Sequence, residues 1–267
     1  MIRILLKADT FLGKTKHQFM WTSIKQQIPN SVTLLNAWAG AAAIISLFSG
    51  QWEVLPYCLL VSLMADFGDG LLARLLKAQS PLGKELDSLA DLISFGFFPA
   101  AMLYQLFMQA LGLPEGLQWG QRESYLLLLP FLLLLFSALR LAKFNTDSRQ
   151  SESFIGLNTP ATTLFVFGYF WTVQQQLYGL EQYLLWPPLL YGLLALLCYL
   201  LIAEIPLLSF KFKSLAWQPN RWRFLLILGI LPLLIFLPLG LALPAGIVLY
   251  LLLSVVAIVV GDLRLGE

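Results

Sequence analysis

Four aspartates that stand in or beside long apolar stretches are the residues of this chain best suited to chemistry. Asp66 and Asp69 are three residues apart, and Asp87 and Asp91 are four apart, so each pair shares one face of a helix. An acidic residue at the centre of a membrane helix costs about 2.5–3.5 kcal/mol on insertion scales. Clustered carboxylates also repel one another, and hard cations such as Mg²⁺ or Mn²⁺ relieve that repulsion. The spacing therefore predicts a metal site, with two ions as in phosphoryl-transfer enzymes.

The residues between the aspartates favour a phosphate-bearing ligand beside the metals. Gly70 and Ala73 keep one helix face small, so that a bulky ligand can approach the backbone. Arg74 supplies a forked cation of the kind that grips phosphate. Gly83 is interpreted as the turn between the two acidic helices, and it also permits close approach. The alternative interpretation is a group of solvated loop and cap residues at a helix junction.

The segment from Asp66 to Asp91 resembles the signature of the CDP-alcohol phosphatidyltransferase family, D-x2-D-G-x2-A-R-x8-G-x3-D-x3-D, and has every fixed residue. Members of that family are integral membrane enzymes that join a CDP-activated lipid or alcohol to a second alcohol and release CMP. The resemblance implies that Asp66, Asp69 and Asp87 bind the metals. It also implies that Asp91 lies at the metal site and acts as the catalytic general base.

The same resemblance implies a nucleotide and diphosphate site. It assigns that role to the residues of the signature and of the preceding Pro-Asn-x2-Thr segment, namely Asn30, Thr33, Gly70, Ala73, Arg74 and Gly83.

Segments outside the signature resemble the branch of the family that uses serine as the acceptor. They are Ser94-Phe95-Gly96, Arg140 to Asn145 and Phe154 to Ala161, although Lys143 replaces an arginine and Asn158 a proline. The implied reaction transfers the phosphatidyl group of CDP-diacylglycerol to the hydroxyl of L-serine, and gives phosphatidylserine and CMP. A single direct displacement is expected, because the motif offers no obvious covalent nucleophile. A homodimer is also implied, and no nucleic-acid partner is expected.

A serine acceptor needs groups that bind its carboxylate. The candidates are the basic and polar residues that follow the signature, namely Ser94, Arg140, Lys143, Asn145 and Arg149. The alternative interpretation of the basic ones is ordinary anchoring at the cytoplasmic membrane surface.

Composition predicts an all-α integral membrane protein, since 58% of the 267 residues are hydrophobic and only 12% are charged, about half the charged fraction of soluble domains. Apolar stretches predict about eight transmembrane helices. Their ranges are 31–49, 55–73, 87–111, 125–145, 159–178, 184–204, 224–241 and 243–260. The last two are separated by only a few residues around Pro244, so they are expected to form a tight hairpin or one broken unit.

The chain divides into three predicted parts. Residues 1–30 form a cytoplasmic segment with an interfacial amphipathic helix at 14–27, residues 31–207 form a six-helix catalytic core, and residues 208–267 form a basic linker and a C-terminal helical pair. All 17 lysines and arginines except Arg122 fall in segments on one side of this topology. The positive-inside rule makes that side cytoplasmic. Both termini and the active site are therefore expected on the cytoplasmic face, of a bacterial inner membrane.

Other functions remain open. Within the family, the acceptor could be glycerol-3-phosphate or inositol, and the lipid could be ether-linked. A divalent-cation transporter also places aspartates in membrane helices, but it gains nothing from Arg74 beside the ligands. The single histidine, His17, excludes a histidine-based zinc protease site.

Overall fold

The computed structural model describes residues 2–146, 154–208 and 217–263, and the described chain is almost entirely helical. It divides into two compact units, Met1–Ser94 and Phe95–Glu267.

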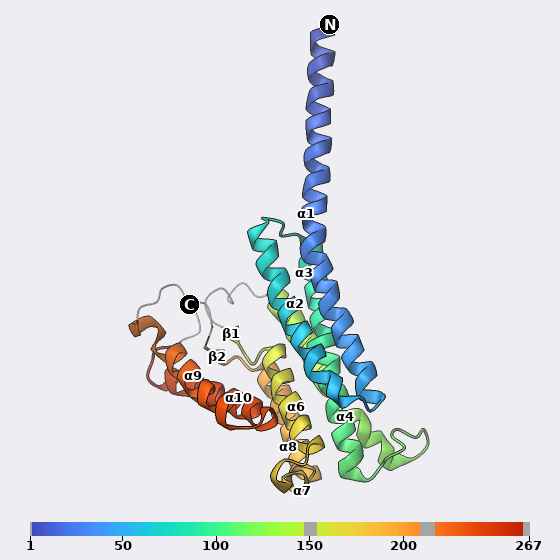
Figure 1. The fold of residues 1–267 in the computed structure, drawn as a ribbon, viewed down its shortest axis with the longest axis vertical. Helices are drawn as coiled ribbons and strands as arrows, with labels where there is room; N and C mark the ends of the chain where they lie inside the picture. The colour runs from blue at the N-terminus through green and yellow to red at the C-terminus, as the bar shows by residue number, and fades with distance from the viewer. Residues whose placement is uncertain (1, 147–153, 209–216, 264–267) are drawn as a thin grey trace. The chain divides into compact units, whose positions relative to one another are not determined.

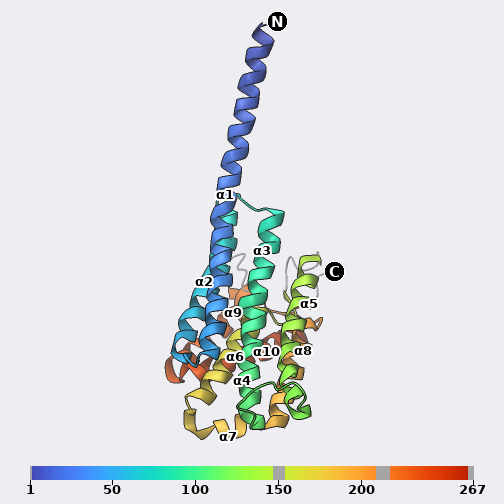
Figure 2. The same ribbon diagram turned by 90° about the vertical axis from the view of Figure 1, so that its right-hand side faces the viewer.

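The first unit is built from three helices, and Figures 1 and 2 show them side by side. The helix α1 (Ile2–Phe48) and α2 (Leu55–Leu75) form an antiparallel hairpin, joined through the short η1 (Trp52–Val54). The helix α3 (Pro81–Asp91) packs against α1. Residues 14–27, the predicted interfacial helix, are helical but belong to the continuous α1, and their place at a membrane surface stays a prediction.

The start of α3 is fixed by a helix cap. The side chain of Ser80 accepts a hydrogen bond from the backbone N–H of Gly83 at 3.0 Å, and Pro81 occupies the first turn, where its missing N–H is not needed. The interpretation of Gly83 as a turn was therefore wrong, because this glycine lies inside α3. The turn lies before Ser80, where Lys77 adopts a left-handed φ of 49°.

A π-helical turn, η2 (Leu92–Phe97), follows α3 directly. Its Ser94 hydroxyl donates to the backbone carbonyl of Asn36 in α1 at 2.8 Å. Gly40, one turn further along α1, makes this approach possible, since a Cβ on it would lie 2.7 Å from the Cα of Ser94.

The second unit contains the remaining helices and two short strands. In chain order they are α4 (Phe98–Leu111), η3 (Arg122–Phe131), α5 (Leu132–Thr146), β1 (Phe154–Ile155), α6 (Thr159–Gln174), η5 (Leu177–Gly179), α7 (Glu181–Leu184), α8 (Pro187–Ile202), β2 (Pro206–Leu207), α9 (Trp217–Phe236) and α10 (Leu239–Val259). The strands form a two-residue antiparallel ladder, with Phe154 opposite Leu207. Within this unit α5 packs on α8, and α10 packs on both α6 and α9.

The final hairpin breaks earlier than the sequence predicted. The break falls between α9 and α10 at residues 237–238, and Pro244 lies inside α10. Pro244 is accommodated because Gly168 of α6 leaves room for its ring and for the nearby carbonyl of Gly240, which a Cβ at Gly168 would approach to 2.8 Å.

The open ends of this hairpin are tied together by one acidic group. The exposed carboxylate of Asp262 accepts hydrogen bonds from the Trp222 indole, at 2.6 Å, and from Arg221. These donors, the Trp222 indole first, lower the pKa of Asp262.

Five helical stretches of the described chain are long and apolar enough to cross a membrane. They are Lys25–Phe48, Trp52–Leu75, Pro81–Leu111, Arg122–Thr146 and Leu239–Val259, and Pro187–Ile202 is a shorter apolar helix. The predicted class, an all-α integral membrane protein, is confirmed. Helix is found in all eight predicted ranges, but the number of eight spans stays a prediction.

We expect Gly40→Ala to lower the thermal unfolding midpoint in detergent by several degrees. The new methyl group meets the backbone of Ser94, and overpacking of this kind costs about 1–3 kcal/mol. Gly192→Ala is the matched control, since no atom of the described residues lies within 4 Å of a Cβ at that position in α8. Equal midpoints for the two variants would show that α1 can move away from Ser94 without loss of thermal stability.

Candidate metal and nucleotide site

Three carboxylates of the first unit converge between α2 and α3. Asp66, Asp69 and Asp87 each offer one oxygen atom, and these atoms lie within 4.8 Å of one another. Asp66 and Asp69 are brought together by the helical repeat of α2, and Asp87 comes from the facing side of α3. The structure therefore brings together the three residues that were predicted as metal ligands.

The chemistry of this cluster fits a divalent cation. The Oδ1 atom of Asp87 is buried and receives no hydrogen bond from any described residue. A buried anionic oxygen without a donor is costly unless a positive charge compensates it. Oxygen atoms of three carboxylates are the ligands that Mg²⁺ and Mn²⁺ prefer.

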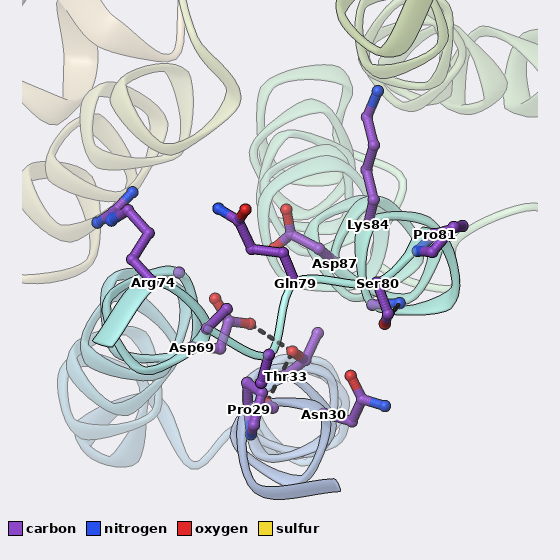
Figure 3. A pocket seen from close by; sticks show the side chains of 14 residues that line it. Pro29, Asn30, Thr33, Asp69, Arg74, Gln79, Ser80, Pro81, Lys84 and Asp87 are labelled. Carbon is purple, nitrogen blue, oxygen red and sulfur yellow. Dashed lines mark hydrogen bonds between the residues drawn. The ribbon is translucent and has the colours of Figure 1, made fainter. Parts of the chain in front are cut away.

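Thr33 of α1 holds one of the three carboxylates in place. Its hydroxyl lies 2.5 Å from Oδ2 of Asp69, and both side chains are buried. Figure 3 shows this contact at the edge of the pocket. A donor on one side of Asp69 fixes the rotamer of the carboxylate and so the direction of its other oxygen.

A pocket of about 530 Å³ opens beside the acidic cluster, within the range of sites that bind small molecules. Asp69 and Asp87 line it, with all six residues predicted to bind nucleotide and diphosphate: Asn30, Thr33, Gly70, Ala73, Arg74 and Gly83. Sequence reasoning missed the other lining residues, which are Pro29, Ala78, Gln79, Ser80, Pro81 and Lys84. The Ser80-Pro81 pair was a readable helix-start signal that places this loop at the site.

Two glycines determine the shape of the pocket. A Cβ on Gly83 would lie 3.1 Å from both the Asn30 amide oxygen and the Ser80 hydroxyl, so glycine lets α3 approach α1 closely. A Cβ on Gly70 would meet only the Arg74 guanidinium, at 4.0 Å. The space beside Gly70 is therefore open to a ligand that reaches the backbone of α2.

Asp91 does not belong to the group of three converging carboxylates, although it lies near them. It accepts a hydrogen bond from Nδ2 of Asn36 at 3.2 Å, and it is near enough to Asp66 for their charges to interact. It does not line the pocket. Its roles as a metal ligand and as the base stay predictions. Asn36 is a residue whose contact with Asp91 sequence reasoning did not assign.

The candidates for the acceptor site are distributed differently. Ser94 is buried in the first unit and its hydroxyl is bonded to a backbone carbonyl, so this placement gives no support to a role in acceptor binding. Arg140, Lys143 and Asn145 belong to α5 of the second unit, and Arg149 lies outside the described residues.

Of the three on α5, Arg140 is the buried one. It is 7% exposed, and its guanidinium carbon lies 5.9 Å from the centre of the Phe144 ring. Its charge also acts on Tyr250 of α10. Contact of these residues with an acceptor stays a prediction.

Comparisons with known proteins find several relatives that share one name. A protein named CDP-diacylglycerol–serine O-phosphatidyltransferase from Helicobacter pylori is 33% identical over 140 residues, which are 52% of this chain and 54% of that protein. Proteins of the same name from Bacillus subtilis and Saccharomyces cerevisiae are 32% and 33% identical, over 50% and 55% of this chain and 69% and 54% of their own lengths. The chain thus spans about half the length of several of the relatives it matches.

The family model of the CDP-alcohol phosphatidyltransferases matches residues 26–206, which include the acidic cluster and the whole pocket. With that match and the complete aspartate signature, the chain belongs to the CDP-alcohol phosphatidyltransferase family.

Proposed function

We propose that this chain transfers the phosphatidyl group of CDP-diacylglycerol to L-serine and releases phosphatidylserine and CMP. The observation that carries the proposal is the gathering of Asp66, Asp69 and Asp87 beside a pocket that also contains Arg74. The names of the relatives support serine as the acceptor.

The metal proposed for this site is Mg²⁺ or Mn²⁺, in two copies. Asp66, Asp69 and Asp87 are the proposed ligands, with Asp91 as a fourth. When bound, the cations supply the positive charge that neutralises a diphosphate and stabilises the leaving CMP.

The other residues of the pocket are proposed to hold the CDP group. Arg74 pairs with the diphosphate through its planar fork. Gly70, Ala73 and Gly83 leave the room in which the nucleotide can lie against the helices. Asn30 and Thr33 border the same space from α1.

The proposed reaction is a single displacement at the β-phosphorus. Asp91 removes the proton from the serine hydroxyl, and the serine oxygen forms a bond to the phosphorus that bears the diacylglycerol group. The bond from that phosphorus to the bridging oxygen breaks, and CMP leaves with the electron pair. Arg140, Lys143, Asn145 and Arg149 are proposed to bind the serine carboxylate. The site is proposed to face the cytoplasm, in a homodimer in the bacterial inner membrane.

Metal binding can be tested without turnover. We expect Asp87→Asn to weaken Mn²⁺ binding by about tenfold or more, measured by electron paramagnetic resonance titration of the purified protein. Glu85→Gln is the matched control, since Glu85 is an exposed acid on the same helix, outside the cluster. Equal Mn²⁺ affinity for the two variants would exclude Asp87 as a ligand.

The reaction is tested by CMP release from CDP-diacylglycerol with Mn²⁺ or Mg²⁺, comparing L-serine, glycerol-3-phosphate and myo-inositol. We expect release with L-serine only, lost in EDTA and absent in Asp91→Asn. Release with another acceptor would overturn serine as the substrate. Absence of release with all three would overturn the proposed reaction and favour cation transport.

The acceptor site can be tested separately from the CDP-lipid site. We expect Arg140→Ala to raise the KM for L-serine by about tenfold or more, with a much smaller change for CDP-diacylglycerol. Because Arg140 is buried, Arg140→Lys serves as a second variant that keeps the charge and loses the fork. Arg122→Ala is the control for loss of a basic side chain. Equal changes in both KM values would argue against a contact with the serine carboxylate.

A further inference from the structure

Asn36 is a buried amide whose side chain is turned toward Asp91. Its side chain is 0% exposed, and its Nδ2 atom donates to Oδ1 of Asp91 at 3.2 Å. Its Oδ1 atom has no hydrogen-bond partner among the described residues. The contact with Asp91 therefore sets the orientation of the amide, since the reverse orientation would bring two acceptor oxygens together.

The backbone of Asn36 is held by the helical segment that carries Asp91. The carbonyl of Asn36 accepts the hydroxyl of Ser94 at 2.8 Å, and the hydroxyl of Ser62 lies 3.4 Å from the same oxygen. Ser94 lies one turn after Asp91. The segment from Asp91 to Ser94 thus binds Asn36 at two points, once by the side chain and once by the backbone.

This double attachment makes a closed and rigid link. Gly40 allows α1 to lie directly against Ser94. Asn36 is therefore held close to the segment from Asp91 to Ser94. Neither the amide nor the carboxylate can rotate without breaking a hydrogen bond inside a buried region, where a lost bond is expensive. One oxygen of Asp91 is thereby held, and this contact also determines the direction of the other oxygen.

We propose that Asn36 is a positioning residue, which holds the Asp91 carboxylate in the orientation needed to take the proton of the acceptor alcohol. The inference rests on the proposed function, and deepens it by naming the residue that orients the base. Proton transfer requires the base to be within hydrogen-bond reach of the hydroxyl. A carboxylate that rotates freely spends less time in an orientation that allows this transfer. Asn36 acts through Asp91 and does not itself contact the substrate.

The test uses the full-length protein with Asn36→Ala and Asn36→Leu, the second of which keeps the buried volume. We expect kcat per folded enzyme to fall by about 10- to 100-fold in both. We also expect the KM for CDP-diacylglycerol to stay within about twofold of wild type. Thr172→Val is the control for loss of a different buried polar group: it removes a hydroxyl that donates to the carbonyl of Gly168 at 2.9 Å. Its kcat per folded enzyme should be unchanged.

Two results would overturn the inference while the proposed function stands. One is an unchanged kcat in both variants of Asn36. The other is a loss of kcat that accompanies an equal loss of CDP-diacylglycerol binding, which indicates a general structural role. Activity ratios are measured with whichever acceptor supports CMP release in the wild type, so an error about serine does not affect the result. A wild type that releases no CMP with any acceptor would overturn the proposed function and this inference together.

Discussion

Repulsion between carboxylates in apolar helices is the constraint on which the rest of the first unit depends. Two unit charges 4 Å apart repel by about 4 kcal/mol at an effective dielectric constant near 20, and Asp66, Asp69 and Asp87 bring three carboxylates within 4.8 Å of one another. A divalent cation would convert this repulsion into cross-links between α2 and α3. Any such binding would also favour the folded state, because the separate carboxylates of an unfolded chain make no equivalent site.

The acidic helices are supported by a polar stripe on α1. Asn30, Thr33 and Asn36 are each three residues apart and therefore lie near one face of α1. Thr33 contacts Asp69, and Asn36 contacts Asp91. Neutral polar groups of α1 thus orient acidic side chains without cancelling their charge. That negative charge remains available to a cation.

Several features of the site could be predicted from the sequence because they depend on local spacing. The helical repeat alone places Asp66 beside Asp69, and Arg74 belongs to the same α2. Gly83 was misplaced because glycine was taken as the stronger turn signal, whereas the Ser80-Pro81 pair determines where α3 begins. The helix break expected around Pro244 was also wrong. The neighbouring Gly168 leaves room for the proline ring, so Pro244 lies inside α10.

Other features depend on contacts between residues far apart in the chain. The π-helical turn after Asp91 has no periodicity that distinguishes it from an α-helix. Ser94 was taken as an acceptor residue, but its hydroxyl is used by the carbonyl of Asn36. Such a partner is visible only when α1 and the π-helical turn are side by side, so no pattern within either segment predicts it.

The pocket has much of its volume because several of the residues that line it have small side chains or none. Gly70, Ala73, Ala78 and Gly83 supply little more than backbone to its walls. A larger residue at any of them would occupy the space that a ligand of this pocket needs. A small inhibitor that filled this space would therefore leave few routes to resistance, because substitutions that exclude it would also exclude the ligand proposed for this pocket.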